Sequence, residues 1–580
     1  MGNPSAEKGM MLKEPLLNPT QKGGFRTLPF IIANEAFEKV ASYGLMPNMI
    51  IYLMSEYHLD MATGSNVLFL WSAATNFLPV LGAFLADSLL GRFKMIGFGS
   101  IISLVGMTLL WSTTMISQAR PPPCKEFDSS CSSSTTLQLI LLFSAFGLMS
   151  IGAGGIRSSS LAFGADQLDK RDNLKSVGAL ESYFSWYYAS ISISVIIALS
   201  CVVYLQENMG WEVGFGVPAV LMFASAVSFL LASPFYVKLK ANASLFTGFV
   251  QVIAVSYRNR HIALSSERTN MMYHHKKGSL LLVPSEKLRW LNKACIIKVS
   301  TEEETLLGRT SDSWSVCTVD QVEELKALLK VIPLWSAGMI MSVNISQTSF
   351  AVLQATSMDR HITSSFQIPS GSFGMFTVIS VIVWVALYDR VILPVASRIM
   401  KRPARLDPKQ RMGVGIFFSF LAMVVTAIVE YIRRGLAIKG GYANEPLAVV
   451  RMSALWLLPQ HCLTGLAEAM NAIGQNEFYF SEFPRSMSSV ATTLVGVGMA
   501  GANLLASFIM TTIDQATGEG GEKSWISSNI NEGHYDYYYW VLAGLSFSNM
   551  IYFLVCSKAY GPCEGLGVRA WLEGDEPGDG

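Results

Sequence analysis

The sequence predicts an all-α integral membrane protein in which two bundles of six spanning helices are joined by a long polar linker. Of its 580 residues, 51% are hydrophobic and 15% are charged, a composition typical of membrane proteins. The chain contains ten uncharged runs of roughly 18 residues or more, the length that a spanning helix needs. Backbone groups in hydrocarbon must be hydrogen-bonded within their own segment or in a closed barrel, and uniformly apolar runs of this length fit helices.

The uncharged runs supply most of the predicted spans. Two further apolar segments, 27–55 and 452–481, are long enough to cross a bilayer but contain charged residues, so the expected total is twelve. The ten uncharged runs are 61–86, 95–119, 132–156, 182–206, 213–237, 331–358, 362–388, 412–429, 486–513 and 537–557.

The order of the spans divides the chain into five regions. Most Lys and Arg residues of the loops fall on the side of both tails and the linker, so we expect these parts to face the cytosol, in a multi-pass protein of the plasma membrane. The start of the linker is expected to be flexible, and its end, "VDQVEELKALLKVIP", to be an amphipathic surface helix that leads into the seventh span. The expected regions are an N-terminal tail at 1–26, the N-terminal bundle at 27–237, the linker at 238–322, the C-terminal bundle at 323–558 and a C-terminal tail at 559–580.

Two of the eight cysteines lie in a predicted outer loop with the sequence "PPPCKEFDSSC". Cys124 and Cys131 are therefore expected in an oxidising environment, where a disulfide can form. Two free thiols are the alternative, and the sequence leaves both open. The other cysteines lack metal-ligand spacing, so no metal site is expected.

One glycine motif, "GVGMAG" at 496–501, matches the G-x-G-x-x-G pattern of dinucleotide-binding folds. That pattern requires a strand before it and a βαβ unit around it, whereas this copy lies inside an uncharged run of spanning length. We therefore interpret its glycines as positions of close helix packing in lipid. The chain contains no H-E-x-x-H, G-x-S-x-G or P-loop motif, so we expect no enzyme activity, no organic cofactor and no nucleic-acid partner.

Three charged residues lie inside the first span, in "NEAFEKV". Glu35, Glu38 and Lys39 are spaced so that they project from one helix face. Each charge inside a membrane costs at least roughly 2.5–3.5 kcal/mol, and such residues usually face a bundle interior or an aqueous cavity. A carboxylate beside a cation can be ionised when paired and protonated when its partner leaves. The cluster therefore predicts a proton-coupling device, with a structural salt bridge as the alternative.

Two further charges are expected inside the bundles. Glu468, in "LTGLAEAMNAIGQNEFYF", interrupts the tenth span far from either end. Arg157, in "GAGGIRSSSLAFGADQ", lies inside the fourth span or marks its end. Because arginine stays protonated in proteins, we expect Arg157 to be a fixed anion-binding charge while the glutamates carry the proton.

The loop after the second span, "GAFLADSLLGRFK", contains Asp87 and Arg92. A weaker copy, "LYDRVILPVASRIMKRP", follows the eighth span and contains Asp389 and Arg390. The first copy resembles the signature loop of the major facilitator superfamily, which implies that its acid and base hold neighbouring helices in one conformation. An ordinary charged turn is the alternative. Repetition at matched places in the two halves is what an internal duplication leaves.

Several longer motifs resemble one family. "NEAFEKVASYGL" is similar to the E-x-x-E-[R/K] motif of the proton-dependent peptide and nitrate transporters of the major facilitator superfamily. "FGADQLD", "YFSWYY", "CTVDQVEELKALLKVIPLW" and "WISSNINEGHYDYYYW" are similar to its plant branch. The resemblance extends over about residues 25–560, and "FRTLPFIIANEAFEKVASYGLMPNMIIYL" looks most like the plant subfamily that contains low-affinity nitrate transporters.

This resemblance implies roles for the charged residues. It implies that Glu35, Glu38 and Lys39 couple protons, the only cofactor-like ion expected, and that Arg157 and Glu468 form a partner pair near the substrate. Family members usually have Lys where this chain has Arg157, which excludes a role in which that group loses its proton.

Two other positions depart from the dual-affinity nitrate transporter of the family. Ile345 stands where that transporter has a substrate-binding His in span seven. Met95 stands where it has a regulatory phosphorylated Thr, so a high-affinity mode switched by phosphate is not expected. Asn344 and Gln347, in "SVNISQTSFAVLQ", are the neighbouring polar candidates for substrate contact.

Together, the residues and the resemblance predict a proton-coupled symporter that imports an anion, with low-affinity nitrate as the first candidate, by alternating access. The alternatives are an organic anion, such as gibberellin, jasmonate, abscisic acid or a glucosinolate, and di- or tripeptides. A membrane ligand sensor is an alternative of a different class. The expected partners are a small-molecule or anion substrate and the lipid bilayer; a monomer suffices for transport, and the oligomeric state stays open.

Overall fold

The computed structural model describes ten stretches of the chain. Cys124 and Cys131, the predicted disulfide pair, lie outside them, as do most of both tails. The described residues are 23–123, 133–168, 175–238, 245–262, 273–275, 283–297, 314–401, 406–484, 487–519 and 523–562.

The first half of the chain is helical throughout its described part. Short 3-10 or π-helical turns follow four of its helices, among them the π-helical turns at Ala86–Leu90 and Ala198–Val202. The helices are α1 (Leu28–Leu45), α2 (Met49–Ser55), α3 (Met61–Leu85), α4 (Arg92–Met115), α5 (Thr136–Leu168), α6 (Lys175–Ile197), α7 (Val203–Asn208) and α8 (Trp211–Leu231).

The second half repeats this helical plan and adds two very small sheets. Strand β1 (Met358–Asp359) pairs in parallel with β4 (Val450–Ser453), and β2 (His361–Thr363) pairs antiparallel with β3 (Phe366–Gln367). The helices are α11 (Val319–Ile345), α12 (Thr348–Thr356), α13 (Gly374–Leu387), α14 (Leu393–Met400), α15 (Pro408–Lys439), α16 (Leu458–Glu482), α17 (Ser488–Gly518) and α18 (Tyr535–Tyr560).

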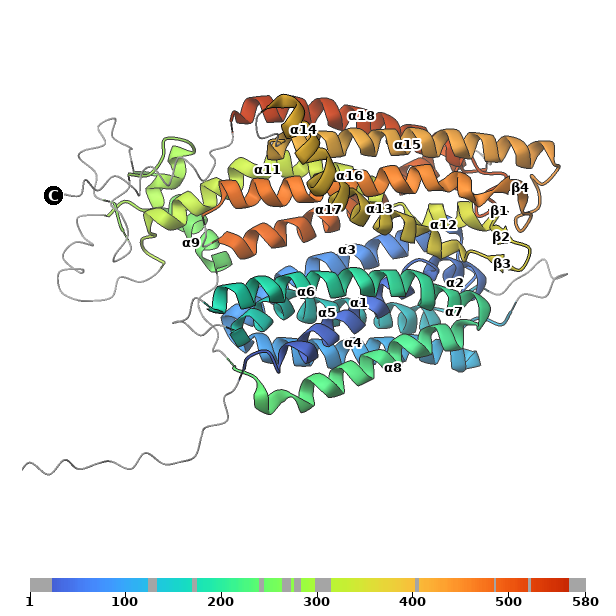
Figure 1. Cartoon of the computed structure of the whole chain (residues 1–580), viewed down its shortest axis with the longest axis horizontal. Coiled ribbons are helices and arrows are strands. Elements are labelled where there is room, and N and C mark those ends of the chain that lie inside the picture. Colours follow the sequence, from blue (N-terminus) through green and yellow to red (C-terminus); the bar gives the residue numbers. More distant parts are fainter. Residues whose placement is uncertain are drawn as a thin grey trace, which may run out of the picture.

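The long helices run roughly parallel or antiparallel to one axis (Figure 1), with α1 to α8 in one layer and α11 to α18 in the other. Helix α9 (Leu245–Arg258), from the segment between the halves, lies at one end of the molecule, which we call the linker end. The four strands lie at the other end, which we call the strand end. The halves contact each other along α3 and α17, among other elements.

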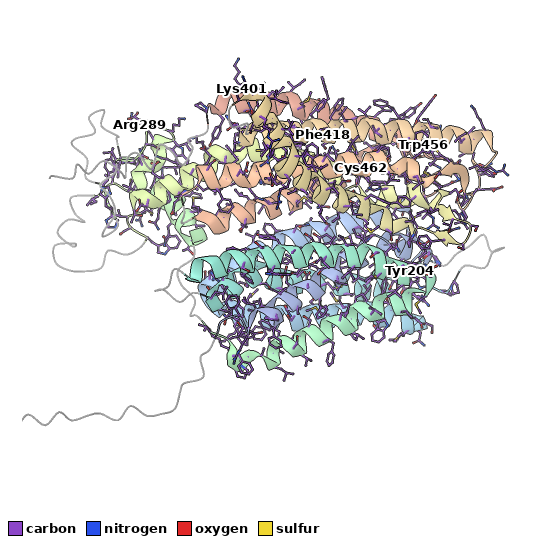
Figure 2. All side chains as sticks on the ribbon, in the orientation of Figure 1. Tyr204, Arg289, Lys401, Phe418, Trp456 and Cys462 are labelled. Carbon is purple, nitrogen blue, oxygen red and sulfur yellow. The ribbon has the colours of Figure 1, made fainter. Side chains whose placement is uncertain are left out.

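Ten helical segments in the described part of the chain are long and apolar enough to cross a membrane. The two long helices outside this set are α1 and α16, which are the two segments in which the sequence places internal charges. Many large apolar side chains are exposed, with Leu231, Phe508 and Ile399 each more than two thirds exposed. Figure 2 shows side chains projecting outward all along the two layers of helices. Soluble proteins rarely expose apolar surface on this scale, so lipid is the expected surrounding of these side chains.

Glycines set the closest helix contacts in both halves. A Cβ added at Gly154 of α5 would lie 2.9 Å from the Leu78 Cβ of α3, and one added at Gly155 would lie 2.9 Å from the Met95 oxygen of α4. Helix α5 therefore approaches both neighbours at backbone distance, as small residues permit in membranes.

The "GVGMAG" motif lies inside α17 and serves the same purpose. Added Cβ atoms at Gly496 and Gly498 would lie 3.2 Å from the Asn76 oxygen and 3.3 Å from the Trp335 Nε1, respectively. The motif thus faces α3 and α11 within a helix, which agrees with the packing interpretation and not with a nucleotide site.

The segment between the halves differs from the expectation in one way. Residues expected to be flexible form α9, which packs against α11 and the 3-10 helix Arg289–Ala294. The expected amphipathic helix that leads into the seventh span is the first part of α11, which starts at Val319 with a capping box from Thr318 and Gln321. Its apolar side chains, among them Val322 and Leu325, are buried with those of α9.

Matched irregularities support the predicted duplication. The charged loop of the first half begins in the π-helical turn Ala86–Leu90, after α3, and its copy begins in the π-helical turn Tyr388–Ile392, after α13. Such turns are rare and are often found at functional sites.

Candidate functional site

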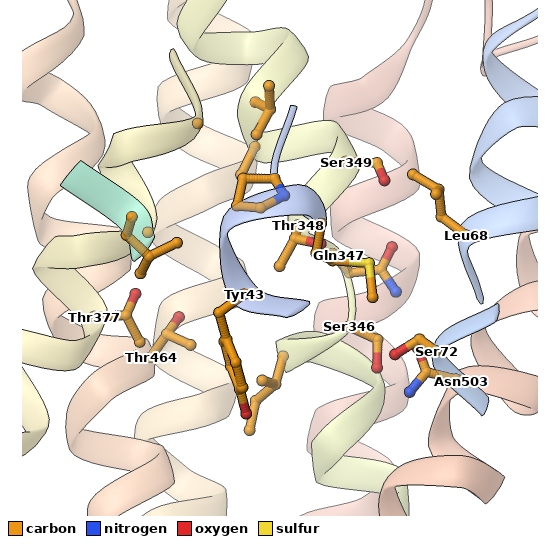
Figure 3. Close-up of a pocket in the computed structure, with 18 of the residues that line it drawn as sticks. Tyr43, Leu68, Ser72, Ser346, Gln347, Thr348, Ser349, Thr377, Thr464 and Asn503 are labelled. Atoms are coloured by element: carbon orange, nitrogen blue, oxygen red, sulfur yellow. The ribbon is translucent and has the colours of Figure 1, made fainter. Parts of the chain in front are cut away.

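A cavity of about 350 Å³ lies between the two halves. Figure 3 shows its wall: Tyr43 of α1 stands opposite Thr377 of α13 and Thr464 of α16, while Ser72 of α3 lies next to Asn503 of α17. Most of the lining is apolar, with a small number of polar and charged side chains. This is the usual composition of a small-molecule site.

The charged cluster of α1 lies just behind this wall. Glu38 is fully buried and Glu35 is 3% exposed. The Lys39 Nζ lies 3.5 Å from Glu35 Oε1 and 3.8 Å from Glu38 Oε2. Ser42, one turn further along, donates a hydrogen bond of 2.6 Å to Glu38 Oε1. The spacing of the acids and the lysine thus brings them together on one face of α1, as the sequence predicts.

Arg157 connects the cluster to the cavity. Its Nη2 donates to Glu38 Oε1 at 2.8 Å, and its Nε lies 3.1 and 3.2 Å from the two carboxylate oxygens. Arg157 lines the cavity, whereas the three charged residues of α1 do not. Helix α5 continues to Leu168, so Arg157 lies inside the span and does not mark its end.

Glycines place Arg157 at this position. A Cβ added at Gly82 of α3 would lie 2.4 Å from the Gly154 oxygen and 2.8 Å from the Ser158 Oγ. Helix α3 therefore contacts the turn of α5 that carries Arg157 without a side chain between them. This close contact fixes the arginine relative to α1 and the cavity.

The second-half wall is built on one face of α16. His461, Thr464 and Glu468 follow one another at intervals of three and four residues, and all three line the cavity with Gln460. Among the described residues no hydrogen bond or ion pair joins Glu468 to a partner, and Arg157 pairs with Glu38 instead. The Arg157–Glu468 pair that the family resemblance implies is therefore not formed here, although both residues face the same cavity.

His461 is held by the neighbouring helix. A Cβ added at Gly465 of α16 would lie 2.5 Å from the Thr377 oxygen, so α13 and α16 touch at backbone distance. One turn away, the Thr377 Oγ1 lies 3.1 Å from His461 Nδ1. The imidazole is 9% exposed, and its Nε2 has no partner among the described residues.

The polar residues of span seven line the cavity, but their side chains are already hydrogen-bonded within the protein. Asn344 Nδ2 donates to Ser419 Oγ and Ser546 Oγ, both at 2.8 Å. Gln347 donates to the Val343 oxygen at 2.8 Å and accepts from Tyr538 Oη at 2.9 Å. The apolar Ile345 lies between them in the cavity wall. Span seven thus offers mainly shape and apolar contact in this conformation.

The predicted gating pair has a third member. Arg92 Nε lies 3.5 Å from Asp87 Oδ1, while Arg92 Nη1 lies 2.8 Å from both carboxylate oxygens of Asp166. The stronger bond thus joins α4 to the end of α5. Sequence reasoning missed Asp166, although it stands in the quoted motif "FGADQLD".

A second internal ion pair was also missed. Glu430 and Arg433 of α15 are both fully buried, with Arg433 Nη2 2.7 Å from Glu430 Oε1. They follow the uncharged run 412–429 directly, which makes them look like the end of a span. Their i, i+3 spacing on a helix that continues to Lys439 is the signal that would have identified them.

Hydrogen bonds between the halves gather toward the strand end. Glu207 of α7 forms an ion pair with Arg360 and accepts from the Ser370 backbone N–H at 3.1 Å. Ser372 donates to the Leu199 oxygen at 2.7 Å. Within the part of the chain that is described, no such bond joins the halves at the linker end, and no group of three His, Cys, Asp or Glu side chains is placed to hold a metal ion.

The sequence matches a known family over most of its length. The model of the POT family matches residues 93–526. The chain is 57% identical over 547 residues to "Protein NRT1/ PTR FAMILY 1.2" of Arabidopsis thaliana, covering 93% of this chain and 90% of the relative. It is 55% identical over 568 residues to "Protein NRT1/ PTR FAMILY 1.1" of the same plant, covering 97% and 96%.

Solved structures share the fold. The structure of an auto-inhibited POT family peptide transporter has a TM-score of 0.68 at 18% identity, covering 93% of this chain and 98% of that one. A POT family transporter in complex with 5-aminolevulinic acid has a TM-score of 0.60 at 14% identity, covering 93% and 99%. The predicted all-α membrane fold is confirmed. The chain therefore belongs to the POT family, the NRT1/PTR family of its plant relatives, and is a multi-pass membrane transporter and not an enzyme.

Proposed function

We propose that the chain is a proton-coupled symporter that moves an anion through the cavity between its halves. The observation that carries this proposal is the buried bond between Arg157 and Glu38. Among the described residues, the strong partner of this cavity-wall cation is a buried carboxylate, so the cation has two alternative anions to bind, the carboxylate or a substrate.

Exchange of Arg157 between Glu38 and a substrate anion couples proton uptake to anion binding. When Glu38 takes up a proton, its attraction for Arg157 weakens and the guanidinium is released toward the cavity to bind an anion. When Glu38 loses the proton again, Arg157 returns to it and the anion leaves. Glu35 and Lys39 complete the cluster, and Glu35 Oε2 has no hydrogen-bond partner in the described residues, so it is a second place for a proton.

The charge balance requires such coupling. Moving one anion inward against an inside-negative potential costs about 2.3 kcal/mol per 100 mV. One proton per anion makes the cycle electroneutral, and two make it run with the potential. We place the linker end and both tails in the cytosol and the chain in the plasma membrane, on the distribution of Lys and Arg. Bonds between the halves at the strand end then make this an inward-facing form.

Nitrate remains the first candidate substrate, on the resemblance to low-affinity nitrate transporters. The cavity favours a second candidate, an organic anion. Its volume of about 350 Å³ lies within the roughly 300–1,000 Å³ of pockets for small organic molecules, and most of its lining is apolar. A peptide is a further candidate because Glu468 has no hydrogen-bond or ion-pair partner within the described part of the chain and is suited to an amino group. A sensor role has no supporting observation in the described residues.

Replacement of Glu38 tests the coupling. In proteoliposomes with an imposed proton gradient, Glu38→Gln should abolish uphill accumulation of nitrate or an organic acid, because Gln cannot cycle a proton. Binding of the anion to the purified variant should persist, since Arg157 is no longer held by a carboxylate. Glu212→Gln, in the same half but in the first turn of α8, is the matched control. Full uphill uptake by Glu38→Gln would refute the proposal.

Electrical recording separates the substrate classes. In oocytes at acid pH, nitrate, an organic acid and a dipeptide offered in turn should produce inward current only for the transported class when two protons move with each anion. A cycle with one proton per anion carries no current, and pH-dependent accumulation of the labelled compound then identifies the class. Ligand binding without any pH-dependent accumulation would favour a sensor.

A further inference from the structure

Two neighbouring residues on the second-half wall of the cavity each have one polar side-chain atom without a described hydrogen-bond partner. His461 is 9% exposed and Gln460 is 4% exposed, and both line the cavity. Neither His461 Nε2 nor Gln460 Oε1 has a hydrogen-bond partner in the described residues. Leaving a buried polar group unsatisfied costs free energy, so each such atom calls for an explanation, such as a bound group that supplies the missing bond.

The orientation of the Gln460 amide is fixed by a chain of bonds that starts at an ion pair. The Glu430 carboxylate, held by Arg433, accepts from Gln354 Nε2 at 2.9 Å. The Gln354 amide must therefore turn its oxygen the other way, where Gln460 Nε2 donates to it at 3.1 Å. Gln460 Oε1 is thus left as a buried acceptor without a described partner, on a residue that lines the cavity.

The His461 ring is held in a comparable way at its other nitrogen. Thr377 Oγ1 contacts Nδ1, and the close approach of α13 at Gly465 keeps the threonine in place. Figure 3 shows Thr377 beside Thr464 on this wall, opposite Tyr43. Depending on the tautomer, Nε2 is a donor or an acceptor.

These partners select the chemistry of the missing group. With the imidazole proton on Nε2 and Thr377 Oγ1 donating to Nδ1, a hydroxyl accepts from Nε2–H and donates its one proton to Gln460 Oε1, so it satisfies both atoms. A carboxylate only accepts and an ammonium only donates, so each fails at one of the two atoms. Both charged groups also have better sites in the same cavity, at Arg157 and at Glu468.

We propose that His461 and Gln460 form a subsite for a hydroxyl group, and that the cavity selects organic acids that carry a hydroxyl at the end remote from the carboxylate. This inference rests on the proposed function, in which Arg157 takes the carboxylate. The apolar lining between the two walls then contacts the body of the molecule.

Two matched acids test the subsite on the purified full-length chain. The probes are 3-phenylpropanoate and 3-(4-hydroxyphenyl)propanoate, which differ by one distal hydroxyl, and the measurement is equilibrium binding by calorimetry. The hydroxylated acid should bind about two- to twelvefold more tightly, the range expected for one net hydrogen bond of about 0.5–1.5 kcal/mol.

Two substitutions of His461 separate its nitrogens. His461→Asn keeps a polar atom near the place of Nδ1, for Thr377, and removes Nε2, so the preference for the hydroxylated acid should fall to about one. His461→Gln carries its amide further out, near the place of Nε2, and should retain part of the preference. Gln460→Met should also reduce it. Cys462→Ala is the control, because Cys462 is the next residue of α16 and does not line the cavity.

The outcomes distinguish this inference from the proposed function. If the wild-type chain binds both acids equally while Arg157→Gln weakens both, the subsite is refuted and the anion site stands. A preference that survives in both His461→Asn and Gln460→Met also refutes the subsite. If Arg157→Gln weakens neither acid, the proposed anion site fails and the subsite with it. If neither acid binds the wild-type chain, the subsite is refuted, and binding of nitrate to the wild-type chain and to Arg157→Gln then tests the anion site by itself.

Discussion

The two walls of the cavity differ in whether their polar groups have hydrogen-bond partners in the protein. On the first-half wall, Arg157 and Glu38 satisfy each other with bonds of 2.8 to 3.2 Å, and Lys39 and Ser42 add further contacts. On the second-half wall, Glu468 has no described partner, and His461 and Gln460 each keep an unpaired atom.

The difference separates two tasks. A closed set of charges can change state when a proton enters, because every member has an alternative partner within reach. Polar groups without a partner in the protein have no second partner to exchange with. Their free energy falls only when a bound molecule supplies the missing hydrogen bonds. We therefore assign coupling and anion binding to the first-half wall, and the choice among anions to the second-half wall.

The largest effect is expected from removing one of the paired charges on the first-half wall. Arg157→Ala leaves Glu38 buried without its main partner, and breaking a buried ion pair in this way costs about 3–5 kcal/mol. Glu468→Ala removes a carboxylate that has no described partner, so it should cost less than about 1 kcal/mol. Chemical unfolding of both variants in the same detergent measures the difference.

A double variant checks the cause. Arg157→Ala combined with Glu38→Gln removes the orphaned charge, so it should recover a large part of the lost stability. If the loss of stability in the double variant equals the sum of the losses in the two single variants, Arg157 and Glu38 contribute through packing and not through charge pairing. The contrast between the two walls then disappears.

A smaller effect is expected from the glycines that position each wall. Gly82→Ala would place a Cβ 2.4 Å from the Gly154 oxygen, and Gly465→Ala would place one 2.5 Å from the Thr377 oxygen. Each variant must separate two helices, at a cost of about 1–3 kcal/mol. Both should therefore lower the melting temperature.

Their functional consequences should differ. Gly82→Ala should disturb proton-driven accumulation because it moves the turn that carries Arg157. Gly465→Ala should leave coupling largely intact and change the choice of substrate because it moves Thr377 away from His461. Equal loss of coupling in both variants, measured in proteoliposomes, would contradict the division of tasks between the walls.

The sequence predicts the first-half wall better than the second, and the reason is physical. Charges such as Glu35, Glu38 and Lys39 stand out in an apolar span because their burial is costly, so a pattern of letters suffices to find them. His461 and Gln460 are neutral and do not interrupt the apolar run, so only the structure shows that a nitrogen and an oxygen are left unpaired.

The sequence also does not reveal which of the internal charges pair with one another. Glu38, Arg157 and Glu468 were all predicted as internal charges, but which two meet depends on how closely α5 approaches α1 and α3. That approach depends on Gly82 and Gly154, whose role requires a backbone distance. Likewise, Asp166 is the nearer partner of Arg92 because α5 ends beside α4, which spacing along the chain does not reveal.

The smallest effect is expected where the two halves meet at the strand end. Glu207 bonds Arg360 and the Ser370 backbone N–H, and the side chains of the ion pair are 29% and 17% exposed. An exposed pair contributes about 0–1 kcal/mol, so Glu207→Gln, which keeps an acceptor for Ser370, should shift the balance between open and closed strand ends at most about fivefold. Glu207→Ala removes both bonds and should shift it further.

Hydrogen exchange of the segment 360–373 reports this opening, because the Ser370 N–H is itself protected by Glu207. Exchange should increase from wild type to Glu207→Gln to Glu207→Ala. The charge swap Glu207→Arg with Arg360→Glu restores the ion pair but not the bond to Ser370, so it should lie near Glu207→Gln. If all three variants exchange like wild type, the halves are held by their apolar contacts alone, and the two walls move without any polar lock between them at this end.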